Sequence, residues 1–174
     1  KAPGVDPARW EKNWQWFEHG ESLYAVYAID PHRVLKVDGG RCEWAHETPC
    51  PWPWAGGERR GGATPVLVGD EFWCFFHDSV PSAPGKMQYR VGLYTFDAAP
   101  PFAIRRAVPG PVLTADATTN GGPGGNYSDV IFPRGAVRLG DEWVLASGVH
   151  DRWTELRRLS HADLDRRLVR LAQS

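Results

Sequence analysis

Two neighbouring parts of the sequence carry side chains that can bind an anion. Arg59 and Arg60 precede Gly61 and Gly62, and His77 ends a run of aromatic and apolar residues. Guanidinium and imidazole groups donate charge-assisted hydrogen bonds to anions, and a glycine pair lets the backbone approach a ligand closely. The alternative is structural: the arginines can form a solvated loop pair, and the histidine can be a satisfied core residue.

The motifs of several other chemistries are missing. The six histidines include no H-x-H or H-E-x-x-H pair, and the three cysteines, Cys42, Cys50 and Cys74, show no C-x-x-C spacing. We therefore predict no metal site. There is no G-x-S-x-G elbow, and the glycine-rich stretch NGGPGGN lacks the Lys-Ser/Thr of a phosphate loop. No organic cofactor is expected.

Charge and hydropathy exclude two large classes of partner. Twenty basic residues face 21 acidic ones, so the net charge of −1 gives no general attraction to nucleic acid or to an anionic membrane. No apolar run approaches the roughly 20 residues that span a bilayer. The start, KAPGVDPARW, lacks an initiator Met and the apolar core of a signal peptide. We expect a cytoplasmic chain that begins within a longer protein or after processing.

The pattern of apolar residues predicts an all-β fold. From about residue 20, short or alternating apolar runs are broken by Gly, Pro and Asp, which is typical of strands and hairpins. The hydrophobic content of 42% is enough for a real core. The predicted strands are 23–29, 33–37, 64–68, 72–77, 90–97, 102–107, 130–132, 136–139, 143–148 and 155–159.

Only the C-terminal segment predicts a helix. Ser160 can cap it, because Asp163 follows three residues later. Leu164, Leu168 and Leu171 fall on one face of a helix. We predict a short terminal helix over residues 160–172.

One hairpin recurs along the chain. TPVLVGDEFWCFFHDS (Thr64–Ser79) and GAVRLGDEWVLASGVHD (Gly135–Asp151) share the frame V-x-[VL]-G-D-E-[FW], and HGESLYAVYAID (His19–Asp30) is a weaker copy. Irregular repeats of small sheets predict propeller blades, and a closed propeller needs about four. We therefore expect about three blades, with residues 1–174 forming the C-terminal portion of a single β-propeller domain. A different sandwich is the alternative.

Three segments, in order, resemble glycoside hydrolase family 130. They are EKNWQWF with LYAVYAIDPH, then RRGGATPVLVGDEFWCFFHDS leading to YRVGLYTFDAAPPFAIRRAVPGPVL, and finally DVIFPRGAVRLGDEWVLASGVHD. Together they cover roughly residues 11 to 151. The resemblance implies a five-bladed β-propeller that cleaves β-mannosides by an inverting displacement, mostly with phosphate as the attacking group. An oligosaccharide would be the substrate, and inorganic phosphate can serve as co-substrate.

The resemblance also implies roles for individual residues. The anion-binding set would be Lys12, His77 and Arg60, with Arg59 as the alternative to Arg60. The substrate-binding set would be Asn13, Tyr89 and Asp151. Each position has a plainer interpretation, since Lys12 and Asn13 can anchor a strand and Asp151 can cap a turn. Three tryptophans can stack on sugar rings or simply pack: Trp14, Trp16 and Trp44.

Two departures from the family pattern keep several functions open. Where the phosphate enzymes carry Arg-Pro, this chain has Asp30-Pro31-His32, and no Asp here matches the family's general acid. We therefore assign no catalytic residue. The first hypothesis is a glycoside phosphorylase, hydrolase or related glycosyltransferase. The second is a non-catalytic carbohydrate-binding propeller, which Asp30 favours, and the third is a protein-interaction propeller.

Overall fold

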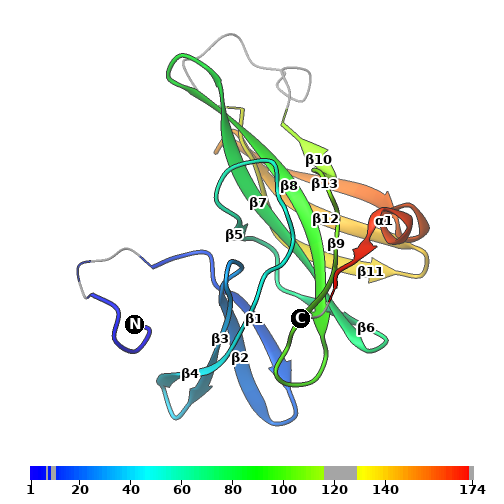
Figure 1. Ribbon diagram of the computed structural model, residues 1–174. Coiled ribbons are helices and arrows are strands. Elements are labelled where there is room, and N and C mark those ends of the chain that lie inside the picture. Colours follow the sequence, from blue (N-terminus) through cyan, green and yellow to red (C-terminus); the bar gives the residue numbers. More distant parts are fainter. Residues whose placement is uncertain (7, 9–10, 116–128, 173–174) are drawn as a thin grey trace.

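The computed structural model describes residues 1–6, 8, 11–115 and 129–172, and strands dominate the described part (Figure 1). The first sheet has the order β1-β2-β3-β4 and consists of β1 (Gln15–His19), β2 (Ser22–Ala28), β3 (His32–Asp38) and β4 (Arg41–Thr48). The third sheet has the order β11-β12-β13 and consists of β11 (Ile131–Leu139), β12 (Glu142–Val149) and β13 (Trp153–Ser160).

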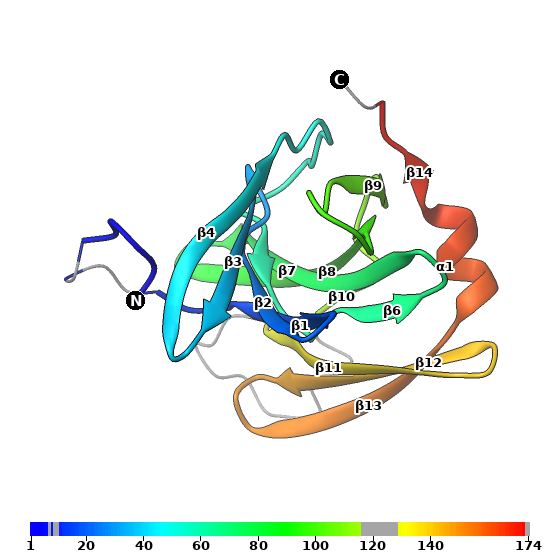
Figure 2. The same cartoon turned by 90° about the horizontal axis from the view of Figure 1, so that it is seen from below.

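The second sheet lies between the other two and contacts both of them (Figure 2). Its main strands are β5 (Arg60–Gly61), β6 (Val66–Val68), β7 (Glu71–Ala83), β8 (Lys86–Asp97) and β9 (Ile104–Ala107). Two short strands complete it: β10 (Leu113–Thr114) pairs with β8, and β14 (Val169–Arg170) pairs with β9. In each sheet the strand that comes first along the chain stands at one end of the strand order, and neighbouring strands pair antiparallel. The chain is a partial β-propeller, as the sequence predicts.

The repeated hairpin has one geometry in all three sheets. Two-residue loops join β1 to β2, β6 to β7 and β11 to β12. The first loop residue is a glycine with positive φ each time: 59° at Gly20, 65° at Gly69 and 60° at Gly140. Such a turn needs a residue without Cβ at its first position. The G-D-E motif therefore marks equivalent turns in the second and third sheets, and Gly20-Glu21 forms the corresponding turn in the first.

Strand β7 explains the uninterrupted apolar run in the sequence. Phe72, Cys74 and Phe76 belong to a core shared with the first sheet, whereas Trp73 and Phe75 belong to a core shared with the third sheet. Because successive side chains point to opposite faces, a strand that is buried on both faces must be apolar throughout. The second sheet is thus the common wall of two cores.

Some predicted elements need correction. Strands β1 and β4 were not predicted, and the helix α1 (His161–Arg167) ends before residue 172. Its N-cap is Ser160, as predicted, with the Asp163 amide donating to the Ser160 hydroxyl. The chain then leaves the helix because Val169 and Arg170 pair with Arg106 and Ala107 on β9. Strand pairing therefore replaces the last helical turns that the leucine spacing indicates.

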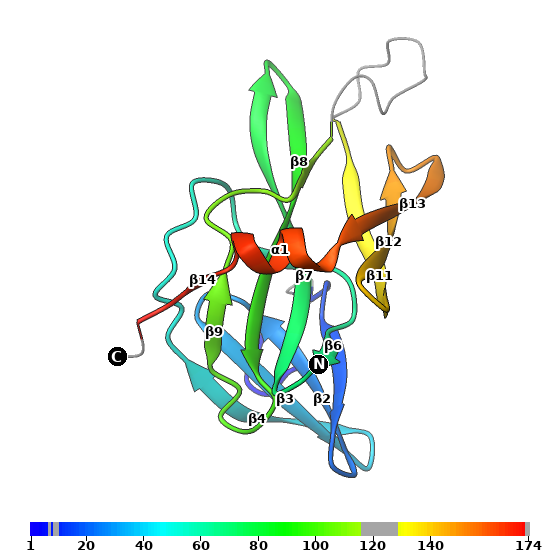
Figure 3. The same cartoon turned by 90° about the vertical axis from the view of Figure 1, so that its right-hand side faces the viewer.

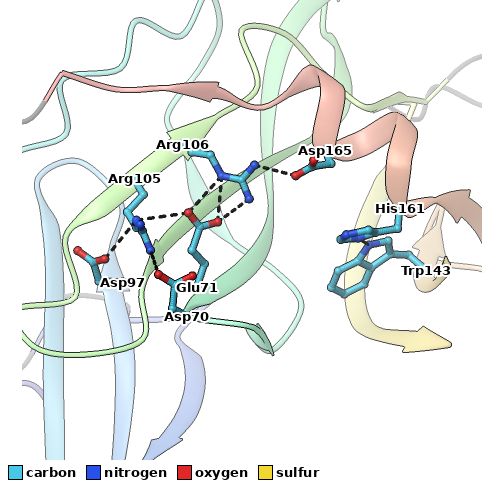
Figure 4. Close-up of polar contacts among 8 residues, drawn as sticks. All are labelled: Asp70, Glu71, Asp97, Arg105, Arg106, Trp143, His161 and Asp165. Atoms are coloured by element: carbon cyan, nitrogen blue, oxygen red, sulfur yellow. Dashed lines mark hydrogen bonds and ion pairs between the residues drawn. The ribbon is translucent and has the colours of Figure 1, made fainter. Parts of the chain in front are cut away.

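The C-terminal segment fastens the third sheet to the second. Figure 3 shows α1 running from the end of β13 across to β9. Arg106 on β9 donates to the buried carboxylate of Glu71 and to Asp165 on α1, while the Trp143 indole donates to His161 (Figure 4). In the described part of the chain, no helix could cross a membrane.

Candidate functional site

The residues predicted for the site meet in one cavity of about 610 Å³ that is lined by segments of all three sheets. We call it the inner cavity. Lys12 and Asn13 directly precede β1, Arg60 lies on β5, and Phe132 and Arg134 lie on β11. All six predicted residues line the cavity: Lys12, Asn13, Arg60, His77, Tyr89 and Asp151. Residues up to 139 positions apart are thus neighbours in space, and their binding roles stay predictions.

His77 forms the buried wall of the inner cavity. Its side chain is only 2% exposed, and its ring lies parallel to Tyr89 and 4.4 Å from the Phe132 ring. The Nδ1 atom has no hydrogen-bond partner among the described residues. Burial, and then the nearby Arg60 charge, lower the pKa of His77 to about 4, against a backbone hydrogen bond with Gly61. The imidazole is therefore neutral at pH 7, and Nδ1 donates to a ligand only in the tautomer that carries the proton on Nδ1.

Arg60 is held at the cavity by neutral groups. Its guanidinium donates to the Ser79 hydroxyl at 2.7 Å and lies 5.8 Å from the centre of the Tyr89 ring. Its Nε atom is buried without a hydrogen-bond partner in the described part of the chain. None of the salt bridges between described residues includes Lys12, Arg60 or Arg134, although most other arginines are paired. Three cations without a salt bridge to a described residue thus line this cavity, together with the carboxylate of Asp151.

Asn13 and Asp151 have unusual backbone conformations. Their φ angles are 65° and 56°, in the left-handed region that residues other than glycine rarely adopt. His150, beside Asp151, also has a positive φ of 52°. Conformations of this kind cluster at binding and catalytic sites. Each of the two turns brings a polar side chain to the cavity wall.

The glycine pair after Arg60 serves a different purpose from the predicted one. A Cβ on Gly61 would collide with the Asn13 carbonyl, and a Cβ on Gly62 would lie 2.6 Å from the Pro133 ring. The two glycines therefore let β5 touch the segments that begin the first and third sheets. The close approach is between segments of the protein itself and not between the backbone and a ligand.

Arg59 lies in a second cavity, also of about 610 Å³, which we call the outer cavity. It forms an ion pair with Asp30 and donates to the Trp52 carbonyl at 2.7 Å. The outer cavity shares Lys12, Asn13 and Arg60 with the inner one, and it adds the rings of Trp14, Tyr27 and Trp54. Of the two predicted alternatives, Arg60 lines the inner cavity, whereas Arg59 lies outside it and is neutralised by Asp30.

Sequence reasoning missed several residues of the inner cavity, notably Phe132, Arg134 and Trp153. Arg134 stands at a bulge between Pro133 and Gly135, and its guanidinium lies over the Phe132 ring. The sequence contained a signal for Phe132 and Arg134, because both stand in FPRG within the third segment that resembles the family. Among the described residues, no group of His, Cys, Asp or Glu is placed to hold a metal ion.

Comparison with known proteins shows what this architecture is. No protein-family model matches the chain, and no curated protein matches it. A solved structure of β-1,2-mannobiose phosphorylase from Listeria innocua, in complex with β-1,2-mannobiose, superposes with a TM-score of 0.70 at 17% identity. A protein from Parabacteroides distasonis, classed provisionally as a glycoside hydrolase, gives 0.62 at 13% identity. The chain shares their fold.

The superpositions cover nearly all of this chain but only about half of each matched structure. The two superpositions cover 93% and 87% of this chain but only 47% and 50% of the other chains. The chain therefore spans about half the length of these structures. Identities of 17% and 13% show a common fold, and the chemistry has to be argued from the cavity itself.

Proposed function

We propose that the chain belongs to a carbohydrate-active enzyme, a glycoside phosphorylase or hydrolase that acts on β-mannoside-type oligosaccharides by inverting displacement. One observation carries the proposal: Lys12, Arg60 and His77, whose Nδ1 atom has no hydrogen-bond partner among the described residues, meet in one cavity, and neither cation forms a salt bridge with a described carboxylate. Unpaired cations and a buried imidazole suit an anion better than a neutral group. The similarity of fold to a mannobiose phosphorylase supports a sugar beside that anion.

In this proposal the cavity residues bind and orient the attacking group. Lys12 and Arg60 hold phosphate by charge, and His77 donates a hydrogen bond from a wall that excludes water. Asn13, Tyr89 and Asp151 contact the sugar. An inverting displacement also needs a general acid that protonates the glycosidic oxygen, on the face of the sugar opposite to the attacking group. We assign no residue of this chain to that role.

The Asp30–Arg59 ion pair favours a second candidate, a non-catalytic carbohydrate-binding propeller. A carboxylate at this position compensates one cation beside the sugar-sized outer cavity. The remaining cations would then serve the fold or a charged sugar rather than a reaction. The aromatic rings of Trp14, Tyr27 and Trp54 are suited to stacking against a pyranose.

Thermal unfolding with inorganic phosphate and with β-1,2-mannobiose tests the proposal. A ligand that binds only the folded chain adds about 2.7 kcal/mol of stability at 100 times its Kd. We expect phosphate to raise Tm, and Arg60→Ala and His77→Ala to remove most of the rise. Arg138→Ala, which alters an exposed arginine further along β11, should leave it intact. Mannobiose binding without any phosphate effect would instead support the binding propeller.

A further inference from the structure

The loop that ends in Arg60 has no strand pairing of its own. Residues 49–59 connect β4 to β5 and belong to neither a helix nor a strand. A long irregular loop is held in one conformation only by specific contacts, because ordering each residue costs about 1–2 kcal/mol. The path of the chain into β5, where Arg60 lies, therefore depends on what fixes this loop.

The carboxylate of Asp78 is the centre of those contacts. Its side chain is wholly buried, yet it accepts hydrogen bonds from the Trp54 indole at 2.7 Å and from the Gly57 amide at 2.9 Å. Arg90 on β8 completes the set with a two-pronged contact, in which Nε donates at 2.9 Å. Arg90 also donates to the Ala55 carbonyl at 3.2 Å and lies over the Trp54 ring. Three loop residues are thus tied to one ion pair.

The loop is also shaped to this ion pair. A Cβ on Gly56 would collide with both Arg90 and Asp78, and a Cβ on Gly57 would collide with the Ser79 carbonyl. Neither glycine has a positive φ, so the requirement is close approach rather than an unusual backbone angle. Burial alone would raise the pKa of Asp78, but the hydrogen bonds from Arg90 and Trp54 lower it. The carboxylate therefore stays ionised, and it holds the loop over the usual pH range.

Strand β7 connects this contact to the inner cavity. His77 lines the cavity, Asp78 holds the loop, and Ser79 accepts the hydrogen bond from Arg60. These three residues are consecutive on one strand, where side chains alternate between the two faces. His77 and Ser79 therefore point toward the cavity and Arg60, and Asp78 points toward the loop. Arg60 also pairs directly with His77 across β5 and β7. The loop, the guanidinium and the imidazole are therefore fixed by a single stretch of backbone.

We propose that Asp78 and Ser79 are positioning residues for the anion site: Asp78, with Arg90, fixes the loop before Arg60, and Ser79 fixes the guanidinium itself. The inference rests on the proposed function, because it assumes that Arg60 binds the anion. An arginine that is already ordered loses less conformational freedom when it binds a ligand, and affinity rises accordingly.

Phosphate affinity in a double-mutant cycle tests this role. Isothermal titration with inorganic phosphate should give a Kd about 3- to 10-fold weaker for Ser79→Ala and for Asp78→Asn than for the unmodified chain. Ser82→Ala, at an exposed position near the end of the same strand, should not change it. In an Arg60→Ala background, neither Ser79→Ala nor Asp78→Asn should weaken binding further. General loosening of the fold would weaken binding in both backgrounds, and that result overturns the inference.

The outcomes separate the two proposals. If Arg60→Ala leaves the phosphate Kd unchanged, or the unmodified chain binds no phosphate, the anion site is wrong and the positioning role falls with it. If Arg60→Ala weakens binding but Ser79→Ala and Asp78→Asn do not, the anion site stands and the positioning role is wrong. Should Asp78→Asn fail to fold, Ser79→Ala decides alone, because its partly exposed hydroxyl is dispensable for the core.

Discussion

Two buried histidines make the stability of this fold sensitive to mild acid. Burial lowers the pKa of His32 to about 4, against a backbone hydrogen bond with Phe102, and the pKa of His77 is also about 4. In the unfolded chain both would titrate near 6.5. The unfolded state therefore takes up protons first as the pH falls. Stability is complete above pH 6.5 and declines between pH 6.5 and about 4.

The expected loss can be measured by urea unfolding at pH 7.5 and pH 5. Each histidine should lower the free energy of unfolding by about 2 kcal/mol over this interval. His32→Gln removes one titrating group, so we expect it to halve the difference between the two pH values, whatever it does to stability at pH 7.5. A difference that His32→Gln leaves unchanged would mean that buried histidines do not cause the acid sensitivity.

At the residue scale, the resemblance to a family predicted more of the cavity residues than local chemistry did. Lys12, Asn13 and Asp151 look like ordinary surface residues in the sequence, and only their place in family-like segments marked them for the cavity that they line. Arg134 lines the same cavity but was not predicted, because its orientation depends on the bulge beside Pro133. The sequence placed Arg60 in the anion-binding set with Arg59 as the alternative, but local chemistry could not separate them, because the difference depends on Asp30 and Ser79, which are distant in sequence.

At the element scale, the pattern of apolar residues predicted most of the strands that place side chains in the cores, although it missed β1. Strands β2, β7, β8 and β12 place apolar residues in the cores. Strand β4 was missed because it is the outer strand of the first sheet and is largely exposed, so its sequence RCEWAHET shows no apolar face. The shortened helix has a similar cause. Pairing with β9 is a tertiary contact, and no local pattern announces it.

The contact of Arg106 on β9 with Glu71 and with Asp165 on α1 gives a prediction at this scale. Arg106 donates to both carboxylate oxygens of Glu71, which is 6% exposed, and its guanidinium covers the Trp73 ring. Arg106→Ala leaves that buried carboxylate with only the longer contact to Arg105. Removing one partner of a buried pair costs about 3 kcal/mol or more. We expect a loss of this size in urea unfolding.

A matched arginine supplies the control. Arg158 pairs with Glu142 on the exposed side of the third sheet, and its side chain is 72% exposed. Surface pairs contribute about 0–1 kcal/mol, so Arg158→Ala should change the free energy of unfolding very little. Equal losses in the two variants would show that Glu71 gains nothing from its burial beside Arg106.

At the scale of the whole molecule, the second sheet is covered on both faces and the third sheet on one only. Trp143 and Leu145 face the core shared with the second sheet. On the other face, Val137, Leu139 and Leu156 are 51%, 60% and 70% exposed. In a propeller each sheet packs both faces against neighbours. The sequence predicted blades of this kind from the repeated hairpin, but it could not indicate which face of a blade is left uncovered.

The exposed face of the third sheet gives the last prediction. Val137 on β11 and Leu156 on β13 flank β12 on its two edges. Val137 pairs with Val144 and Leu156 pairs with Ala146, so both side chains lie on the same face of the sheet. Together with Leu139 they expose apolar side chains around the Arg158–Glu142 ion pair on this face, and exposed apolar area promotes association between molecules. We expect the 174-residue chain to self-associate as its concentration rises, and Leu156→Lys to reduce this association without lowering Tm. Sedimentation velocity over a concentration series measures the first effect, and thermal unfolding measures the second.

Leu159→Lys gives the contrast, because Leu159 packs against the buried core and a charge there should destabilise the fold. Association that is unchanged by Leu156→Lys would place the self-contacting surface elsewhere on the molecule.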